Sequence, residues 1–279
     1  PRLNGGAAEG AGVTVDRGVA VCITLMVRSC NHRPSVVECS EVSHGPHGSV
    51  SRETSLVGRC GRPRGVRTHT GRDSVEADAR VIVREVLSAG GVPIDTELVG
   101  RCGDIADWLG PRAAQLGLTQ YRRGADVALQ LMAPVVPLAA VLASGDKRVA
   151  EVGAGSGALG LALAAVCPTV HVTLIDRRRR AAGFIDLAIR RFGIVNAAAV
   201  CDDFRSHTGA YDWVVARALA PGSAVLARLW RLCGPGGHIG LIESDYVRRA
   251  PAGLRRSSVF TTAIEGLRMN VYEADGPAS

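Results

Sequence analysis

Residues 149–158 read VAEVGAGSGA, which predicts a buried strand, a tight turn and the start of a helix. Glycine stands at the alternate positions Gly153, Gly155 and Gly157, shortly after the acidic Glu151. Glycine suits this turn because it adopts backbone conformations closed to other residues and lets a ligand approach the main chain. The glycines alone leave the ligand open, since Gly153-x-Gly155-x-x-Ala158 also satisfies a looser dinucleotide-binding fingerprint.

Strands and helices are predicted to alternate around this stretch. Strands are predicted at 148–152, 170–175, 197–201, 213–216, 238–242 and, as a pair, within 258–274; helices are predicted at 158–167, 179–192 and 222–232. Such alternation indicates a parallel sheet covered by helices on both faces. We therefore predict an α/β, Rossmann-like, doubly wound fold with a mostly parallel seven-stranded sheet over residues 146–279.

A helical extension is predicted before the sheet, over residues 81–145. Apolar residues recur at helical spacing in 79–89 and 95–114, and 126–141 is a third apolar segment. Pro134 and Pro137 interrupt the third segment, which we interpret as a buried helix with a break.

Residues 1–80 are predicted to be a low-complexity tail that is disordered or non-native. They have no sustained helical or strand period and contain no Phe, Trp or Tyr, so they cannot bury enough apolar surface to offset the entropy of ordering. The sequence begins with Pro1 and its first methionine is Met26. The cysteines and histidines of this segment match no zinc-finger spacing, so we predict no metal site.

The composition is that of a soluble protein with a modest basic excess. The net charge is +7, and Lys147 is the only lysine among 33 basic residues, so the arginines reflect a GC-rich genome as much as nucleic-acid binding. The eight cysteines form no C-x-x-C pair, which favours free thiols in a reducing cytoplasm. No apolar run reaches the roughly 18 residues of a membrane span, so we expect no membrane association.

Acidic residues follow the second and third predicted strands. Asp176 ends the second strand, where a carboxylate can accept both ribose hydroxyls of an adenosine group. Asp202 and Asp203 follow the third strand, where a carboxylate could meet the adenine amino group. Each alone could be a solvated strand end or a helix cap. Together, at the carboxyl ends of successive strands, they favour a nucleoside site.

This ordered set of motifs resembles the class I S-adenosylmethionine-dependent methyltransferases. The sequence YDWVV at 211–215 opens the fourth strand, and LCGPGGH at 232–238 supplies the Pro-Gly-Gly turn that typically precedes the fifth strand in that class. The resemblance implies the class I methyltransferase fold and S-adenosyl-L-methionine as cofactor.

Within that class, the chain resembles the bacterial 16S rRNA guanine-N7 methyltransferase G family, also called glucose-inhibited division protein B. Residues 151–166, 173–184 and 214–221 carry the likeness; ARALAP at 216–221 looks like the family's Ser-Arg-Ala-x-Ala segment, and Leu118-Thr119 like part of its Asn-Leu-Thr segment. Over residues 81–273 the resemblance implies a cytoplasmic, monomeric enzyme of rRNA processing that methylates N7 of a guanine in 16S rRNA or the small ribosomal subunit.

The resemblance also bears on the site. It places Gly153, Ala158, Cys201, Asp202 and Arg217 where the family contacts S-adenosylmethionine, with Arg217 also a candidate for RNA contact or a surface arginine. With the residues argued above, the predicted cofactor-binding set is Glu151, Gly153, Gly155, Gly157, Ala158, Asp176, Cys201, Asp202 and Arg217. No catalytic residue is assigned, because guanine N7 carries no proton and orientation can supply most of the rate.

The chain departs from the family on the substrate side. The family's Arg-His-x-x-Asp-Ser segment is LQLMAP at 129–134, and no lysine stands near 242–244, where the family has one. After Ala158-Leu159, Gly160 is kept but the family's proline is missing. Two alternatives to an rRNA methyltransferase therefore stay open: a methyltransferase of a small molecule or protein, and a catalytically degenerate RNA-binding relative.

Overall fold

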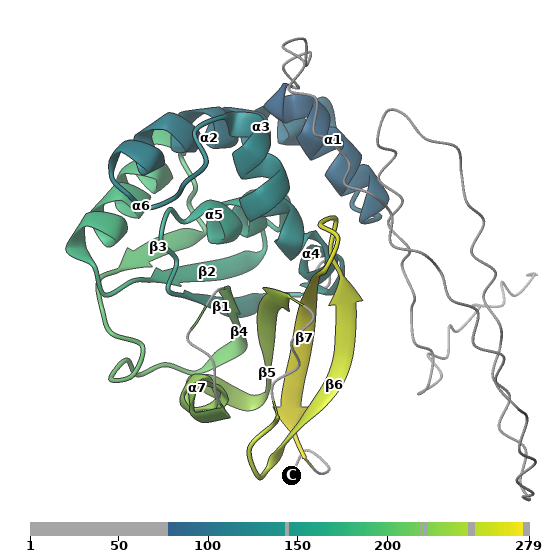
Figure 1. Cartoon of the computed structure of the whole chain (residues 1–279), viewed down its shortest axis with the longest axis vertical. Coiled ribbons are helices and arrows are strands. Elements are labelled where there is room, and N and C mark those ends of the chain that lie inside the picture. The colour runs from purple at the N-terminus through teal and green to yellow at the C-terminus, as the bar shows by residue number, and fades with distance from the viewer. Residues whose placement is uncertain (1–77, 143–144, 218, 220–222, 245–248, 276–279) are drawn as a thin grey trace, which may run out of the picture. The chain divides into compact units, whose positions relative to one another are not determined.

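The computed structural model describes residues 78–142, 145–217, 219, 223–244 and 249–275 (Figure 1). The tail predicted over 1–80 thus lies outside the described residues, except for its last three. Helix α1 (Ala79–Ala89) already begins there, because Asp78 caps it by accepting a hydrogen bond from the Arg80 main-chain N–H at 2.9 Å. Within the described residues, helix α1 therefore begins two residues before the predicted boundary at residue 81.

The seven strands form one mixed sheet. The strands are β1 (Lys147–Val152), β2 (Val170–Ile175), β3 (Ala197–Val200), β4 (Tyr211–Arg217), β5 (Cys233–Ser244), β6 (Leu254–Thr261) and β7 (Leu267–Ala274). Their order is β3-β2-β1-β4-β5-β7-β6. The first five strands run parallel, and β7 lies antiparallel to both β5 and β6. This topology confirms the predicted α/β class I methyltransferase fold with its mostly parallel seven-stranded sheet.

Helices cover the sheet on both faces. The helices that alternate with these strands are α5 (Ala158–Val166), α6 (Arg179–Phe192) and α7 (Ser223–Trp230). Successive residues of β1 point to opposite cores: Val149 packs in the core that includes α5 and α6, whereas Ala150 and Val152 pack in the core that includes α7. A strand buried on both faces reads as an unbroken apolar run, which is why its single acid, Glu151, stands out.

The Pro-Gly-Gly segment lies inside a strand rather than before it. We predicted β5 from His238, but pairing with β4 begins at Cys233. Tyr211 pairs with Cys233 and Trp213 with His238, so the extra residues of β5 form a bulge. Gly236 has a φ of +69°, which suits this irregular backbone.

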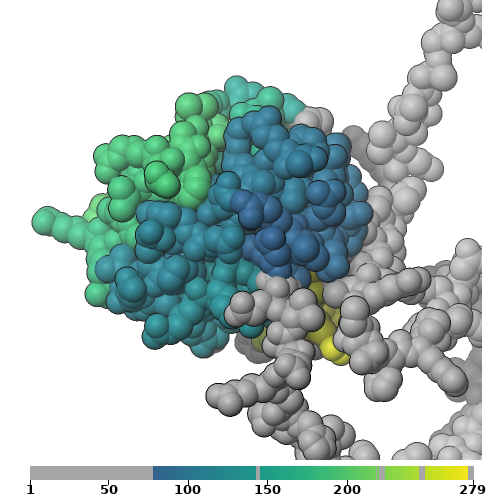
Figure 2. Space-filling model, turned by 90° about the horizontal axis from the view of Figure 1, so that it is seen from above, coloured from purple at the N-terminus to yellow at the C-terminus, as the bar shows by residue number. Residues whose placement is uncertain are grey.

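The helical extension packs on the α5 and α6 side of the sheet. It consists of α1, α2 (Thr96–Gln115) and a continuous helical segment made of α3 (Gly124–Val127), a π-helical turn η1 (Ala128–Met132), a 3-10 turn η2 (Ala133–Val135) and α4 (Val136–Leu142). Figure 2 shows the blue atoms of this extension beside the greener atoms of the α6 region, and α2 contacts both α5 and α6.

The third predicted helix is present and buried, but the predicted break is a change of helical geometry within a continuous segment. Residues 124–142 are long and apolar enough to span a membrane by length and composition, but 67% of the apolar window is buried inside the fold. Pro134 and Pro137 lie within the segment, and the helical geometry changes from α to π to 3-10 around them. The segment is therefore a core helix of this domain.

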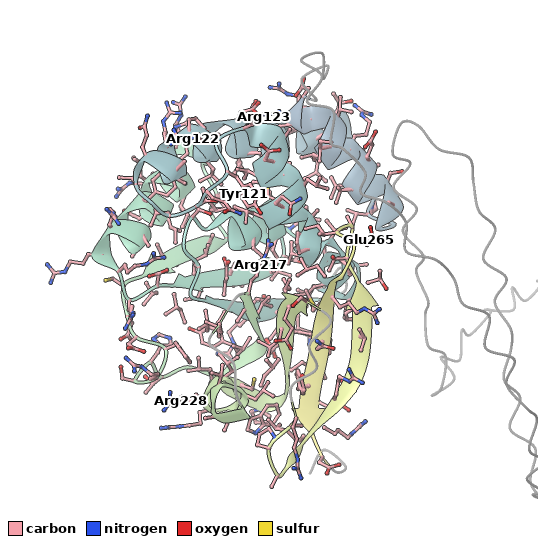
Figure 3. All side chains as sticks on the ribbon, in the orientation of Figure 1. Tyr121, Arg122, Arg123, Arg217, Arg228 and Glu265 are labelled. Carbon is pink, nitrogen blue, oxygen red and sulfur yellow. The ribbon has the colours of Figure 1, made fainter. Side chains whose placement is uncertain are left out.

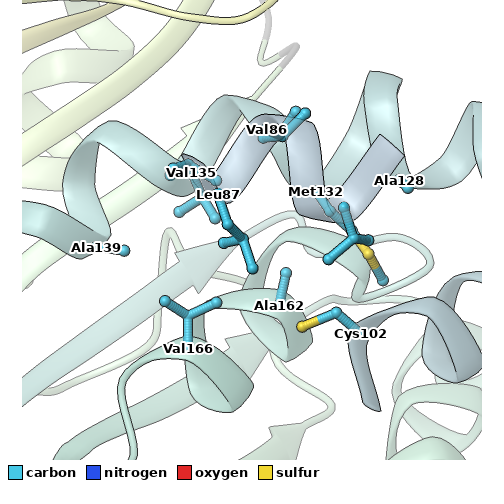
Figure 4. Close-up of a pocket in the computed structure, with 12 residues that line it drawn as sticks. Val86, Leu87, Cys102, Ala128, Met132, Val135, Ala139, Ala162 and Val166 are labelled. Carbon is cyan, nitrogen blue, oxygen red and sulfur yellow. The ribbon is translucent and has the colours of Figure 1, made fainter. Parts of the chain in front are cut away.

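A small apolar cavity lies where the extension meets α5 (Figure 4). Its volume is about 20 Å³, and Cys102 is the one lining residue able to ionise. Burial raises the pKa of the Cys102 thiol to about 12, so this sulfur stays protonated. A void of this size and polarity is a packing defect, too small for a cofactor.

Candidate functional site

The glycine-rich turn follows β1 and is tied to the end of β2. The main-chain N–H groups of Gly153 and Ala154 both donate to the Ile175 carbonyl, at 2.8 and 3.1 Å. Gly153, Gly155 and Gly157 have φ values of +71°, +60° and +74°, a region that L side chains rarely adopt. The sequence pattern therefore marks the positions where the turn requires glycine.

Glu151 lies beneath the turn and caps helix α5. Its side chain is only 6% exposed, and its Oε2 accepts a hydrogen bond from the Gly160 N–H at 2.9 Å. Gly157, the residue before α5, has no side chain to do this. A Cβ at Gly160 would come within 2.5 Å of the same oxygen, which explains the glycine there. Glu151 thus stabilises the turn and the start of α5. It does not line the cavity beside the turn.

Burial makes Glu151 sensitive to pH. Desolvation raises the pKa of Glu151 to about 8; the hydrogen bond from Gly160 acts in the opposite direction, and the nearby Asp176 charge adds to the rise. Because the folded protein holds this proton more tightly than the unfolded chain, the contribution of Glu151 to stability is full below about pH 4.5 and is lost as pH rises toward 8.

We therefore expect Glu151→Gln to stabilise the protein increasingly between pH 5 and 8, by on the order of a few kcal/mol at the upper end. The glutamine amide oxygen can still accept from Gly160, so the cap is kept. Urea unfolding of both proteins across this range measures the difference, with Glu97→Gln on the exposed surface of α2 as the control. A difference that does not change with pH would contradict this account of Glu151.

Asp176 connects the turn to the segment after β2. Its side chain is 4% exposed. One oxygen accepts from the Gly155 N–H (2.9 Å) and from Nη2 of Arg178 (3.0 Å); the other accepts from the main-chain N–H and Nε of Arg178 (2.9 and 3.1 Å). Burial alone would raise the pKa of Asp176, but the bonds from Arg178 and Gly155 outweigh it and lower the pKa. The carboxylate is therefore charged and held in one orientation.

A cavity of about 490 Å³ opens beside these residues, at the carboxyl ends of the parallel strands. Its apolar walls come from Ile175, Phe204, Leu219 and Val225. Its polar lining consists of Asp176, Arg177, Arg178, Asp202, Asp203, Arg205 and Arg228, with the backbone of Gly153. Its size falls within the range of small-molecule sites, and open α/β sheets bind ligands at this edge. The described residues contain no group of side chains able to hold a metal ion.

The residues after β3 form the far wall of the cavity. Asp203 is paired with Arg205, whose hydrogen bonds hold the pKa of Asp203 well below its usual range. Asp202 accepts from the Asp203 N–H at 2.8 Å and from Nδ1 of His207 at 2.8 Å. Cys201 is exposed, and its thiol donates a hydrogen bond to the Arg177 carbonyl at 3.9 Å. Asp202 and Asp203 therefore line the cavity, whereas Cys201 does not.

Arg217 is directed toward the helical extension. Its Nη1 donates to the main-chain carbonyl of Gln130 in the π-helical turn. Four residues after Gln130 stands Pro134, which has no N–H and cannot give this carbonyl the usual helical hydrogen bond. The guanidinium supplies the missing donor. Burial lowers the pKa of Arg217, and the nearby Tyr121 acts in the opposite direction; Figure 3 shows both residues between the helices and the sheet.

The loop after α2 also reaches the glycine turn. The Leu118 carbonyl would lie 3.7 Å from a Cβ placed at Gly155, so the extension forms part of the wall around the turn. Arg122 and Arg123 follow on this loop, at the end of the molecule away from Arg228 (Figure 3). The extension therefore contributes to the surroundings of the site as well as to the core.

The structure divides the predicted site residues into three groups. Gly153, Asp176 and Asp202 line the cavity. Glu151, Gly155, Gly157 and Ala158 shape the turn, with Ala158 buried at the start of α5. Cys201 and Arg217 bond outside the cavity lining. The sequence interpretation missed Arg178 as the partner of Asp176, the wall residues Phe204 and Val225, and the contact of His207 with Asp202. No motif marks these residues: the wall depends on tertiary packing, and the two contacts, although short in sequence, depend on side-chain conformations.

Comparisons with known proteins identify the family. The profile of the family described as rRNA small subunit methyltransferase G matches residues 106–270, more than half of the chain. Ribosomal RNA small subunit methyltransferase G of Thermotoga neapolitana is 37% identical over 94 residues, covering 32% of this chain and 39% of that protein. The protein of the same name from Stenotrophomonas maltophilia is 30% identical over 128 residues, covering 44% and 60%.

Among solved structures, a SAM-dependent methyltransferase from Aquifex aeolicus matches 52% of this chain and 90% of its own, with 17% identity and a TM-score of 0.42. The alignments to the two bacterial relatives span 39% and 60% of those proteins, less than two thirds of either length. The family match includes the helical extension from residue 106 and the sheet as far as residue 270, within β7. The chain belongs to the rRNA small subunit methyltransferase G family.

Proposed function

We propose that this chain is an S-adenosylmethionine-dependent methyltransferase that methylates N7 of a guanine in 16S rRNA. The observation that carries the proposal is the cavity at the carboxyl edge of the sheet, where Gly153, Asp176 and Asp202 meet. The family membership and the names of the bacterial relatives, which are rRNA small subunit methyltransferases, support the substrate class. Ribosomal RNA as substrate implies a cytoplasmic protein, and we expect the protein to act as a monomer.

The residues of the cavity fit an adenosine group. Asp176 can accept the two ribose hydroxyls, Asp202 can accept the adenine amino group, and Phe204 and Val225 offer apolar contact to the base. All four hydrogen bonds of Asp176 come from Gly155 and Arg178, and two of them come from the Arg178 guanidinium. The ribose diol would take the place of that guanidinium, so Arg178 must turn away when the cofactor binds.

The bound cofactor supplies an electrophilic methyl group on a sulfonium. The contribution of the chain is to align the acceptor nitrogen with that methyl group and to exclude water, because N7 needs no deprotonation. A Cβ at Gly153 would lie 3.3 Å from the Leu219 side chain. Glycine at this position therefore leaves the backbone of the turn uncovered where it faces the cavity. Arg217 connects the end of β4 to the extension and so fixes the two walls that would meet the RNA base.

The test is transfer of a tritiated methyl group into 30S particles or 16S rRNA, followed by mapping of the modified guanine. We expect Arg217→Ala to lower the rate at least tenfold, because its partly buried charged hydrogen bond to Gln130 is lost. The matched control is Arg101→Ala on α2, whose pair with Glu97 is exposed and worth little.

The outcomes separate the candidate functions. Incorporation into rRNA that falls with Arg217→Ala but not with Arg101→Ala supports the proposal. Cofactor binding without transfer into any ribosomal RNA would instead favour a degenerate RNA-binding relative. Transfer into a small molecule or protein alone would favour the other alternative.

A further inference from the structure

Asp202 stands on a part of the chain with little regular structure to hold it. The segment 201–210 between β3 and β4 contains no helix or strand. Strand β3 lies at the edge of the sheet, and among the described residues it pairs with β2 alone. The Asp202 side chain is 40% exposed. A carboxylate in this setting needs side-chain contacts to keep one orientation toward the cavity.

A relay of hydrogen bonds supplies that orientation. His207 Nδ1 lies 2.8 Å from Oδ2 of Asp202, and its Nε2 lies 3.0 Å from the Tyr211 hydroxyl. A carboxylate can only accept, so Nδ1 carries the hydrogen of this contact. In the neutral ring Nε2 then accepts the hydrogen of the Tyr211 hydroxyl, which fixes the tautomer.

The relay ends on a rigid strand. Tyr211 is the first residue of β4, and its N–H donates to the Leu232 carbonyl at 2.9 Å. The His207 ring stacks on the Tyr211 ring with 6.2 Å between centroids and 20° between planes, and the His207 side chain is only 12% exposed. The orientation of Asp202 is thus set by β4, although β3 and β4 are separated in the sheet by β2 and β1.

Asp202 keeps acceptor capacity for a ligand. One oxygen takes the Asp203 N–H and the other takes His207, so the carboxylate uses two of its roughly four acceptor positions. The backbone of the loop is held independently, because the N–H groups of Ser206 and His207 both donate to the Asp203 carbonyl at 2.9 Å. Removal of the His207 side chain should therefore free Asp202 without unfolding the loop.

We propose that His207 and Tyr211 are positioning residues that orient Asp202 toward the exocyclic amino group of the cofactor's purine. They would make the site selective for adenine over a purine with oxygen at the same position, because a carboxylate accepts from an amino group and repels a carbonyl. This inference rests on the proposed cofactor and adds the residues that set its base selectivity.

The experiment compares the binding of S-adenosylhomocysteine and S-inosylhomocysteine by calorimetry, with thermal unfolding of each variant. We expect the unaltered protein to prefer the adenine ligand, and His207→Ala to reduce that preference about tenfold. His207→Asn, whose amide nitrogen can replace Nδ1, should restore most of it. Tyr211→Phe, which keeps the ring, should reduce it about threefold.

The matched control is His171→Ala, which removes another histidine–aspartate pair, His171 with Asp146 at 3.4 Å, on the exposed part of β2. A purely structural role for His207 would lower affinity for both ligands equally and leave their ratio unchanged, which would overturn this inference alone. If His207→Ala fails to fold, the ratio of the two ligand affinities in Tyr211→Phe tests the same inference. Failure of the unaltered protein to bind either ligand would overturn the proposed function, and this inference with it.

Discussion

Asp176→Asn should weaken the binding of S-adenosylhomocysteine about 100-fold or more. Charged hydrogen bonds of this kind contribute about 1.5–3 kcal/mol each, and the two ribose hydroxyls would both bind this carboxylate. Asparagine has nearly the same shape but turns one acceptor into a donor. That amide would face either the Gly155 N–H and Nη2 of Arg178, or the main-chain N–H and Nε of Arg178, all of which donate. The change therefore removes a ligand contact and disturbs the turn.

Calorimetry with the purified full chain measures this effect. Asp186→Asn is the matched control, because Asp186 lies on α6, pairs with Arg190 at 2.7 Å and has a 47% exposed side chain. The control should bind the ligand as the unaltered protein does. If Asp176→Asn keeps an affinity within twofold of the original, the ribose does not bind at the end of β2, and the proposed cofactor site is wrong.

Gly157→Ala should destabilise the protein by about 2–4 kcal/mol. Gly157 has a φ of +74°, which costs an L residue about 1–2 kcal/mol. A Cβ there would lie 2.8 Å from Cγ1 of Ile185 and 3.3 Å from Cδ2 of Leu174, both in the packed core. Relief of this overlap requires the turn to move away from α6, so cofactor affinity should fall together with stability.

Thermal and urea unfolding measure the loss of stability, and calorimetry measures the loss of affinity. Gly183→Ala is the control, because Gly183 lies in the middle of α6 with no heavy atom within 4 Å of a Cβ at that position. Alanine there should stabilise the helix by about 0.5–1 kcal/mol. An unchanged melting temperature for Gly157→Ala would show that the turn tolerates a side chain at this position.

The order of elements could be predicted because it depends on local pattern. Helix α6 (Arg179–Phe192) and strand β2 (Val170–Ile175) have the predicted bounds, since apolar spacing and flanking breakers act over a few residues. The bulge in β5 was missed. Pro-Gly-Gly signals a turn locally, whereas its pairing with Tyr211 depends on a neighbouring strand.

The sequence by itself determined the α/β fold, the glycine turn, and the acids that follow β2 and β3, because strand ends and tight turns are fixed by residues next to one another in the chain. Only the tertiary structure decided that Arg217 donates to the Gln130 carbonyl, to which Pro134 has no N–H to offer, and that Tyr211 orients Asp202 through His207. Each of these contacts depends on where packing between elements directs a side chain. Buried polar groups must find partners within the fold, and local sequence does not specify which partner is within reach.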